Sequence, residues 1–461
     1  MGRVLGGGGG RSHATEGKLT SAPGTVRSGS GPADNAGMSS TRRLRPLKVP
    51  DGARAPEILP ELRRALDGDG PALLPIPEED PAARETARAL GADEPLDPEE
   101  DSPRDPTALV IATSGSTGQP KGVLLSSAAL RASARATHRH LGGPGQWLLA
   151  MPAHHIAGIQ VLIRSLLADR PAPAVDSTAG FRPEVFADTA EEVLSVPDRH
   201  YTALVPTQLG RLLAPESDPR GLRALRAFDA VLVGGSAIAP SLLDSARQAG
   251  VNVVTTYGMS ETAGGCVYDG KPLPGVEVHV EAPSPGAISL SGPTLARGYR
   301  RSGGGTAFAD GWFRTGDLGE WRDGQLDVLG RADDLIVTGG VNVAPAVVER
   351  ALSEHPLVRE VCVLGGPDPE WGQAVLAAVV PAGEAPPPEE LRAAVRERAG
   401  AVCVPKRFAV LDELPRRGPG KPDRTALLGM FACHGENESS TGLPTGSDDP
   451  MREDDPHGLS R

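Results

Sequence analysis

The sequence lacks the features of several protein classes. It contains no run of about 18 apolar residues, the length that a membrane-spanning helix requires. Its first residues, MGRVLGGGGGRSHATEGK, lack the continuous apolar region of a secretory signal peptide. The chain has only four cysteines in 461 residues, Cys266, Cys362, Cys403 and Cys433, and no two of them form a CxxC pair. This spacing indicates neither a disulfide framework nor a zinc cluster, so we expect reduced and mostly buried thiols.

Positive charge is also scarce. Lysine and arginine number 47 against 59 aspartates and glutamates, which gives a net charge of −12. A chain without a basic excess does not attract nucleic acid or anionic lipid over its whole surface. We therefore expect a soluble, cytoplasmic protein that binds neither nucleic acid nor membranes. The net charge does not argue against small anionic ligands, because a single pocket can be positive. A homodimer is left open.

The two ends of the chain have the composition of disordered segments. Residues 1–47 are rich in glycine, serine and arginine and show no apolar periodicity, which predicts a disordered leader. Met38 is an alternative start of the chain. Residues 433–461 are acidic and polar and predict a disordered acidic tail. We expect the chemistry to lie between these two segments.

Between the ends, short apolar runs rich in β-formers alternate with helical patterns. A run at 109–112 is followed by a helical pattern at 127–141, and a run at 147–151 by one at 156–167. The alternation continues with strands predicted at 203–205, 230–233 and 251–255 and helices at 208–213 and 240–248. Such βαβ units are typical of an α/β protein with mostly parallel sheets.

From about Val276 the pattern changes to short strands separated by turns, which predicts an antiparallel β subdomain that includes VEVHVE, AISLSG and GQLDVLG. A smaller α+β unit follows, with strands expected at 335–337, 361–364 and 375–380 and helices at 346–352 and 388–398. We therefore predict a multidomain α/β protein with a large N-terminal domain at 48–332 and a small, mobile C-terminal domain at 333–432.

The segment 113–122, TSGSTGQPKG, has the chemistry of a phosphate-binding loop. It follows an apolar strand and precedes a helix predicted to begin at Ser126 or Ser127. Three glycines let the backbone approach an anion, four hydroxyls can donate to phosphate oxygens, and a lysine adds a positive charge. It is not a Walker A loop, because proline precedes the lysine and glycine follows it. The predicted phosphate contacts are Thr113, Ser114, Gly115, Ser116, Thr117, Gly118 and Lys121.

This loop resembles the S-G-[ST]-T-G-x-P-K-G motif of the adenylate-forming superfamily, which includes acyl-CoA synthetases, peptide-synthetase adenylation domains and luciferases. Other motifs similar to those of the superfamily follow in order: YGMSET at 257–262, GWFRTGD at 311–317, GRADD at 330–334 and GPGK at 418–421. The resemblance covers about residues 107 to 427. It implies an ATP-dependent ligase that forms an acyl-adenylate and then a thioester, with Mg²⁺ required and coenzyme A as co-substrate.

The resemblance also implies roles for the residues of the first of these motifs. Glu261 is the implied Mg²⁺ ligand, which suits an ion that binds one carboxylate together with substrate phosphates. Ser260, where the superfamily more often has threonine, is the implied hydroxyl contact to a nucleotide phosphate. Tyr257 and Gly258 are expected near the adenine.

The later motifs carry further implied roles. Asp317 follows Thr315 and Gly316, which we expect to form a turn, and it is the implied acceptor for the ribose hydroxyls. Arg331 is the expected second nucleotide contact, since its planar fork suits ribose or phosphate oxygens. Asp333 stands at the implied hinge between the domains. Lys421 is the implied catalytic lysine, which bridges carboxylate and phosphate oxygens during adenylation.

Two glycines, Gly339 and Gly340, lie where the superfamily passes the pantetheine arm of coenzyme A. They are followed by Val341, where the superfamily commonly has glutamate.

Three segments resemble 2-succinylbenzoate–CoA ligases of menaquinone biosynthesis: MPAHHIAG at 151–158, LVPTQL at 204–209 and VGGSA at 233–237. The resemblance implies that His155, Gly235 and Ser236 contact the acid, and that His155 belongs with Lys421, Glu261 and Ser260 among the catalytic residues. His154 is the weaker candidate of the histidine pair. A dicarboxylate with an aromatic ring needs an apolar slot and a cationic end. Arg164 and Arg211 are candidate cations that the sequence does not rank.

Other functions stay open at this point. The acid could be another aryl or short acyl acid, or the chain could be a stand-alone adenylation enzyme that loads a carrier protein. A catalytically silent nucleotide-binding scaffold is an alternative from a different class. Such a protein is expected to have lost at least one site residue, whereas the phosphate loop, Glu261, Asp317, Arg331 and Lys421 are all present here.

Overall fold

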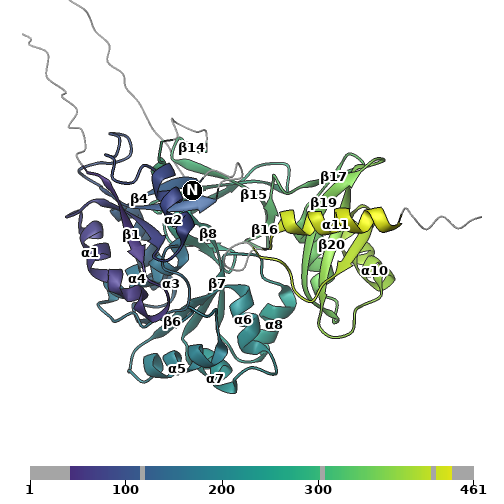
Figure 1. The fold of residues 1–461 in the computed structure, drawn as a ribbon, viewed down its shortest axis with the longest axis horizontal. Coiled ribbons are helices and arrows are strands. Elements are labelled where there is room, and N and C mark those ends of the chain that lie inside the picture. Colours follow the sequence, from purple (N-terminus) through teal and green to yellow (C-terminus); the bar gives the residue numbers. More distant parts are fainter. Residues whose placement is uncertain (1–41, 115–119, 302–306, 417–421, 439–461) are drawn as a thin grey trace, which may run out of the picture. The chain divides into compact units, whose positions relative to one another are not determined.

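The structure is a computed structural model that describes residues 42–114, 120–301, 307–416 and 422–438, all within the compact unit Ser39–Arg461 (Figure 1). Within these ranges no helix is both long and apolar enough to cross a membrane.

The first sheet has five strands in the order β1-β2-β3-β4-β13. β1 and β2 pair in parallel, as do β2 and β3, whereas β4 is antiparallel to both β3 and β13. The strands are β1 (Leu44–Val49), β2 (Ala72–Pro77), β3 (Thr107–Ser114), β4 (Pro120–Ser126) and β13 (Gly298–Tyr299).

The second sheet has six strands in the order β10-β9-β8-β7-β6-β5. The four strands β5 to β8 pair in parallel. β9 pairs with β8, and β10 with β9, in antiparallel orientation. The strands are β5 (Gln146–Leu149), β6 (His200–Leu204), β7 (Ala230–Gly234), β8 (Val253–Met259), β9 (Gly264–Tyr268) and β10 (Lys271–Pro272).

Helices cover both faces of both sheets, so the strands are apolar on both sides. In β3, Leu109 and Ile111 enter the core between the two sheets, while Val110 between them enters the outer core of the first sheet. In β5, Trp147 enters the inner core and Leu148 the outer core of the second sheet. Consecutive side chains of a strand thus fill different cores, which is why these strands occur as continuous apolar runs.

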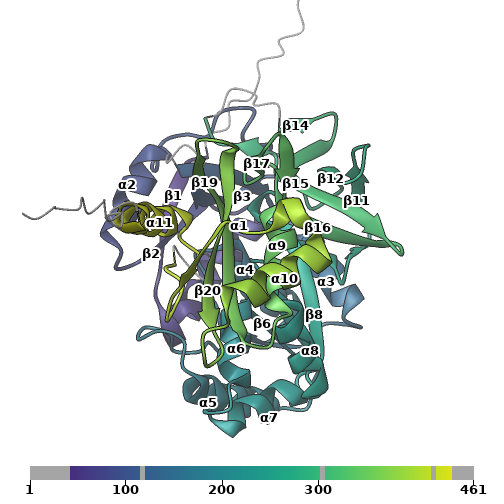
Figure 2. The same cartoon turned by 90° about the vertical axis from the view of Figure 1, so that its right-hand side faces the viewer.

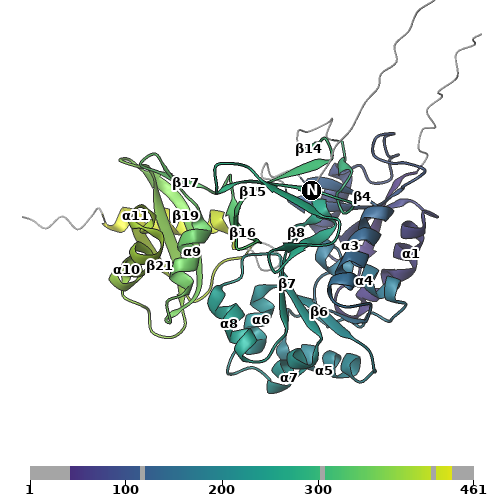
Figure 3. The same ribbon diagram turned by 180° about the vertical axis from the view of Figure 1, so that it is seen from behind.

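The helices around these two sheets form three groups, and Figure 3 labels all of their members from behind except α2. Between the sheets lie α1 (Leu59–Asp67), α3 (Ser127–His140) and α4 (Ile156–Ala168), with the 3₁₀ turn η1 (Gly52–Ile58) before α1. The outer face of the first sheet is covered by α2 (Pro81–Ala89). The outer face of the second sheet is covered by α5 (Pro183–Leu194), α6 (Pro206–Leu213), α7 (Pro219–Ala227) and α8 (Pro240–Gln248).

The predicted β subdomain is an antiparallel sheet in the order β11-β12-β15-β14, with β16 paired to β15. Its long strand β15 turns into β16 through Asp323 and Gly324, which have φ of 50° and 76°, as in the type I′ turn that suits two-residue hairpins. The strands are β11 (Glu277–Val280), β12 (Gly286–Ser291), β14 (Phe308–Ala309), β15 (Trp312–Arg322) and β16 (Gln325–Arg331).

The C-terminal sheet has the order β18-β17-β20-β19, with β21 parallel to β20. Side chains of β20 alternate between two cores: one with α9 and α10, the other with α11. Figure 2 shows α10 on one side of β20 and α11 on the other. The elements are β17 (Ile336–Thr338), β18 (Val341–Val343), α9 (Pro345–Ser353), β19 (Val358–Asp368), β20 (Gly372–Pro381), α10 (Pro388–Ala399), the 3₁₀ turn η3 (Ala401–Cys403), β21 (Arg407–Val410) and α11 (Arg424–Glu438).

Two predicted boundaries are wrong. The leader was expected to reach residue 47, but β1 begins at Leu44, and both Leu44 and Leu47 are buried. The acidic tail was expected from residue 433, but α11 continues to Glu438. In both places a few residues belong to a regular element whose stability comes from packing of its apolar neighbours, and this packing is not visible in local composition.

The prediction of an α/β fold with several sheets is confirmed, and the strands predicted in the second sheet are parallel. The prediction for the cysteines is confirmed for Cys266, Cys362 and Cys403, which are free and buried. The side chain of Cys433 lies outside the described residues.

Candidate active site

The segment predicted to bind phosphate includes the paired ends of β3 and β4, two antiparallel strands that we call the phosphate hairpin. Thr113 pairs with Lys121 and Ser114 with Pro120. The segment was expected to lead from a strand into a helix, but β4 intervenes, so it does not lie at a helix N-terminus. The predicted helix start is correct, since the Ser126 hydroxyl caps α3 by accepting from the Ala129 amide at 3.1 Å. Gly115, Ser116, Thr117 and Gly118 lie outside the described residues, as does the Ser114 side chain.

Lys121 and Glu261 meet at a residue that the sequence analysis did not single out. The Lys121 ammonium lies 5.3 Å from the centre of the Tyr299 ring, and the Tyr299 hydroxyl donates to Oε1 of Glu261 at 2.8 Å. Burial, and then the nearby Glu261 carboxylate, raise the pKa of Tyr299, so the phenol stays protonated as a donor. The fold therefore brings the loop lysine and the implied metal ligand to one place.

Glu261 lies in a tight turn, η2 (Ser260–Thr262), that follows β8. The fully buried Thr262 hydroxyl accepts from the Met259 amide at 2.9 Å and donates to the Gly264 carbonyl at 2.7 Å. Ala263 then takes a left-handed conformation with φ of 51°. Thr262 thus fixes the turn that presents Ser260 and Glu261, a role that the motif alone did not indicate.

Asp317 and Tyr257 form the second part of the site. The Tyr257 hydroxyl donates to Oδ2 of Asp317 at 2.6 Å, and Arg331 Nη1 lies 3.7 Å from Oδ1. Asp317 was expected after a Thr-Gly turn, but it lies within β15, paired with Arg331 across the β15–β16 hairpin. Of Thr315, Gly316 and Asp317, only Gly316 has a positive φ, 77°. The sequence predicted a turn here, whereas the structure has a local distortion of a continuous strand. Burial raises the pKa of Asp317.

Gly258 follows Tyr257 in β8 and lies against the neighbouring strand β9. A Cβ at this position would overlap the Gly264 carbonyl oxygen, so no larger residue fits there without a shift of the backbone.

Arg331 is joined to the predicted hinge residue. Its guanidinium donates from Nε to Oδ1 of Asp333 at 3.0 Å and from Nη2 to Oδ2 at 3.2 Å. This bidentate pair raises the pKa of Arg331 and lowers that of Asp333. Arg331, the expected nucleotide contact, is therefore bonded to Asp333 and also lies close to the Asp317 carboxylate.

The parallel strands of the second sheet bring the remaining predicted residues to one edge. After the carboxyl end of β5 come His154 and His155, after β7 come Gly235 and Ser236, and after β8 comes the turn of Glu261. In open α/β sheets ligands bind outside the carboxyl ends of the strands. The candidate acid-binding residues and the candidate metal ligand thus share this edge.

The two histidines are in ring contact, with centroids 4.2 Å apart. His155 is the N-cap residue of α4, and burial lowers the pKa of His154, which favours a neutral ring. A Cβ on Gly158 would overlap the Pro152 carbonyl oxygen. The start of α4 is therefore packed tightly against the segment that carries the histidines.

The two candidate cations have partners elsewhere in the fold. Arg164 is 3% exposed and stacks over the Trp147 ring at 4.8 Å, within the core between α4 and β5. Arg211 is exposed near the end of α6, where it donates to the Phe181 carbonyl at 3.2 Å. Its guanidinium is thus bonded to the backbone of the segment that precedes α5. The sequence could not place either one, because it does not show which helix face meets the sheet.

Gly339 and Gly340 form the turn between β17 and β18, with φ of 57° and 79°. A Cβ on Gly339 would overlap the Trp371 indole, which is 42% exposed. Val341, the departure from the superfamily pattern, is 46% exposed. Trp371 was not among the predicted residues. Lys421 lies outside the described residues.

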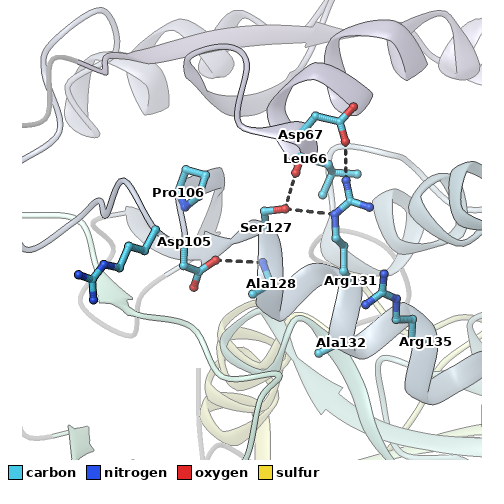
Figure 4. Close-up of a pocket in the computed structure, with 10 residues that line it drawn as sticks. Leu66, Asp67, Asp105, Pro106, Ser127, Ala128, Arg131, Ala132 and Arg135 are labelled. Atoms are coloured by element: carbon cyan, nitrogen blue, oxygen red, sulfur yellow. Dashed lines mark hydrogen bonds and ion pairs between the residues drawn. The ribbon is translucent and has the colours of Figure 1, made fainter.

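A cavity of about 400 Å³ lies elsewhere, between the end of α1 and the start of α3 (Figure 4). Arg131 is paired with Asp67 at 2.6 Å and donates to the Ser127 hydroxyl at 3.3 Å. No predicted site residue lines it, and α3 begins at the end of β4 opposite to the phosphate hairpin. This cavity is therefore separate from the candidate site.

The donor set fits a metal ion that is carried by a nucleotide. Within the described part of the chain no group of three or more histidine, cysteine, aspartate or glutamate side chains could hold a metal. Glu261 next to the phosphate hairpin offers one carboxylate, and Mg²⁺ commonly binds through one or two carboxylates together with substrate phosphates.

Comparisons with known proteins agree with this geometry. Over 395 residues the chain is 46% identical to the probable 2-succinylbenzoate–CoA ligase of Mycobacterium tuberculosis, which covers 84% of this chain and 99% of that protein. It is 35% identical over 354 residues to the 2-succinylbenzoate–CoA ligase of Bacillus licheniformis, with 70% of each chain covered.

Among solved structures, the o-succinylbenzoate CoA synthetase of Bacillus subtilis in complex with ATP and magnesium ion is 26% identical, with a TM-score of 0.68 over 84% of this chain and 90% of that one. The same enzyme with the acyl-adenylate intermediate has a TM-score of 0.65 at 27% identity, over 84% of this chain and 89% of that one.

Two family matches cover most of the described chain. Residues 51–300 match the AMP-binding enzyme family, and residues 347–421 match the AMP-binding enzyme C-terminal domain. The two matches stand in the order that the motifs predict, and the first of them includes the phosphate hairpin and Glu261. The chain belongs to the AMP-binding enzyme family.

Proposed function

We propose that this protein is an AMP-forming acid–CoA ligase that converts 2-succinylbenzoate to 2-succinylbenzoyl-CoA in menaquinone biosynthesis. The observation that carries the proposal is the 46% identity to a probable 2-succinylbenzoate–CoA ligase across 99% of that protein's length. Two arrangements support the same chemistry: Lys121 and Glu261 both contact Tyr299, and the Tyr257 hydroxyl is hydrogen-bonded to Asp317.

The first half-reaction joins the acid to AMP. A carboxylate oxygen of the acid attacks the α-phosphorus of ATP, the bond to the β-phosphate oxygen breaks, and pyrophosphate leaves. Charge develops on the phosphoryl oxygens, so cations and donors aimed at them lower the barrier. Thr113, Lys121 and the hydroxyls of the loop bind phosphate in this proposal, and Ser260 adds a hydroxyl. Glu261 would hold a Mg²⁺ ion, which would supply positive charge to the phosphate oxygens.

The nucleotide is oriented by the second part of the site. Asp317 accepts hydrogen bonds from the ribose hydroxyls, and the Tyr257 hydroxyl fixes the orientation of its carboxylate. Arg331 lies beside it and contributes a planar donor. The adenine is bound near Tyr257 and Gly258.

The second half-reaction makes the thioester. The thiol of coenzyme A attacks the acyl carbonyl, AMP leaves with the former carboxylate oxygen, and the thiol loses its proton. We assign Lys421 to adenylation only and Asp333 to the hinge between the half-reactions. Gly339 and Gly340 lie along the path of the pantetheine arm, where their lack of side chains leaves room.

The acid is bound at the carboxyl edge of the second sheet. His155 at the start of α4 and Gly235 and Ser236 after β7 are the proposed contacts. Of the two candidate cations for the second carboxylate, Arg164 is enclosed in the core and Arg211 is exposed on α6.

The test is pyrophosphate release with ATP and Mg²⁺ over a panel of acids that includes 2-succinylbenzoate, benzoate and succinate, with and without coenzyme A. We expect fast release of pyrophosphate with 2-succinylbenzoate and with no other acid of the panel. Turnover only with another aryl or short acyl acid would reject 2-succinylbenzoate as the substrate, while the assignment as an AMP-forming ligase would stand. Transfer of the acyl group to a carrier protein, without saturation by free coenzyme A, would favour the stand-alone adenylation enzyme. Nucleotide binding without release of pyrophosphate would favour the silent scaffold.

The assignment of Lys421 has its own test. Lys421→Ala is expected to lose acyl-adenylate formation by about 100- to 1,000-fold, because one stabilising charge is removed. It should still form the thioester from preformed adenylate. Equal loss of both steps would refute the role.

A further inference from the structure

The segment 296–300 connects the two charged parts of the site through its backbone. The Ala296 amide donates to the carbonyl of Glu261 at 2.7 Å, and the Arg300 amide donates to the carbonyl of Gly122, next to Lys121, at 2.7 Å. Between them the Arg297 amide donates to Leu124 at 2.8 Å. The segment therefore sets the position of the metal-ligand turn relative to the phosphate hairpin.

Arg300 anchors this segment from its other side. Its side chain is 1% exposed, forms an ion pair with Glu100, and donates from Nε to the Leu90 carbonyl at 2.6 Å. Since neighbouring residues of a strand point to opposite faces, Tyr299 points away from these partners and toward the site. The backbone of Tyr299 is therefore held in place by the buried ion pair between Arg300 and Glu100.

The Tyr299 side chain contacts both charges. Its hydroxyl donates to Glu261 Oε1 at 2.8 Å, and its ring lies 5.3 Å from the Lys121 ammonium. The ring packs edge-on against Phe308, with centroids 5.5 Å apart. Lys121 and Glu261 are both described, and no ion pair within 4.0 Å joins them. Tyr299 is therefore the contact that the two charged groups share.

We propose that Tyr299 is a positioning residue that holds the Glu261 carboxylate through Oε1 and leaves its second oxygen for the nucleotide-bound metal ion. Groups that hydrogen-bond a metal ligand orient it, and their loss commonly costs 10- to 100-fold in metal affinity. The cation–π contact supports the lysine in the same position. The inference rests on the proposed function only in requiring that the protein bind ATP with Mg²⁺.

The test is Tyr299→Phe, which keeps the ring and removes the hydroxyl. ATP binding is measured by isothermal titration at increasing Mg²⁺ and in EDTA, with no acid present. We expect half-maximal strengthening of ATP binding to require about 10-fold more Mg²⁺ than in the wild type, with unchanged affinity in EDTA. The matched control is Tyr201→Phe, which removes a buried hydroxyl bonded to the Leu141 and Gly143 carbonyls. It should leave the Mg²⁺ dependence unchanged.

Three results would overturn the proposal: an unchanged Mg²⁺ dependence in Tyr299→Phe, an equal loss of affinity in EDTA, or wild-type ATP binding that does not depend on Mg²⁺. If Tyr299→Phe does not fold, 4-aminophenylalanine and 4-methylphenylalanine at position 299 are compared, because only the first keeps a donor. Since no acid is used, failure of the 2-succinylbenzoate assignment leaves this result unaffected.

Discussion

The Tyr257 hydroxyl and the Asp317 carboxylate are joined by a 2.6 Å hydrogen bond between the end of β8 and the middle of β15. Sixty residues separate them in the sequence. The bond links the six-stranded sheet to the antiparallel β subdomain at the place where we assign ribose binding.

Asp317→Asn should weaken ATP binding about 10- to 100-fold, because hydrogen bonds to a charged acceptor contribute about 1.5–3 kcal/mol. Isothermal titration with ATP and Mg²⁺ measures the effect. Asp323→Asn, in the exposed turn of the same subdomain, is the matched control and should bind ATP normally. An unchanged dissociation constant in Asp317→Asn would remove Asp317 from the nucleotide site.

The same substitution should stabilise the ligand-free protein at high pH. Burial raises the pKa of Asp317, so between its usual and its raised pKa the folded state holds the proton more tightly than the unfolded state. The free energy of unfolding of the wild type therefore falls as pH rises through this window. We expect Asp317→Asn to unfold at higher denaturant than the wild type at pH 8, with the difference narrowing toward pH 4. A variant less stable at pH 8 contradicts this prediction.

Asp333→Pro should slow one half-reaction and spare the other, because proline fixes φ at a residue whose backbone must rotate between them. Asp333→Ala removes the same carboxylate, and with it the two bonds to Arg331, but keeps the backbone free. Adenylate formation and thioester formation are measured separately for both variants. Equal losses in both steps, or the same profile for alanine and proline, would argue against a hinge at Asp333.

Arg300→Met should cost about 3–5 kcal/mol in the free energy of unfolding, because it leaves the Glu100 carboxylate buried without its partner. Adding Glu100→Leu should recover part of the loss, since the unpaired charge is then removed. Denaturant titration of the two variants gives both values. Arg54→Met, whose ion pair with Glu57 is exposed on both sides, is expected to cost less. A double variant no more stable than Arg300→Met would contradict the buried-charge explanation.

The sequence predicted the elements whose apolar residues are consecutive or periodic. The strand at Leu109, the helix of Ser127 and the helix at Pro240 occur close to their expected positions because both faces of the sheets are covered. β4 was missed, since its PKGVLLS sequence follows a glycine-rich loop and ends at a helix cap. Its strand conformation depends on pairing with β3 and β13.

The site was predicted only as far as motifs reach. Glu261, Asp317 and Lys121 were each identified, but their mutual placement depends on partners distant in sequence. Tyr299 lies 38 residues from Glu261 and belongs to no motif that was singled out. Arg164 was a reasonable candidate for an acid pocket by residue type, and only the packing of α4 on β5 shows that it is enclosed.

The central claim is most directly tested by the mass of the product formed from 2-succinylbenzoate, ATP, Mg²⁺ and coenzyme A. The account predicts 2-succinylbenzoyl-CoA together with AMP and pyrophosphate, and acyl-adenylate alone when coenzyme A is omitted. Absence of both the thioester and the adenylate, with product formed from a different acid, would contradict it.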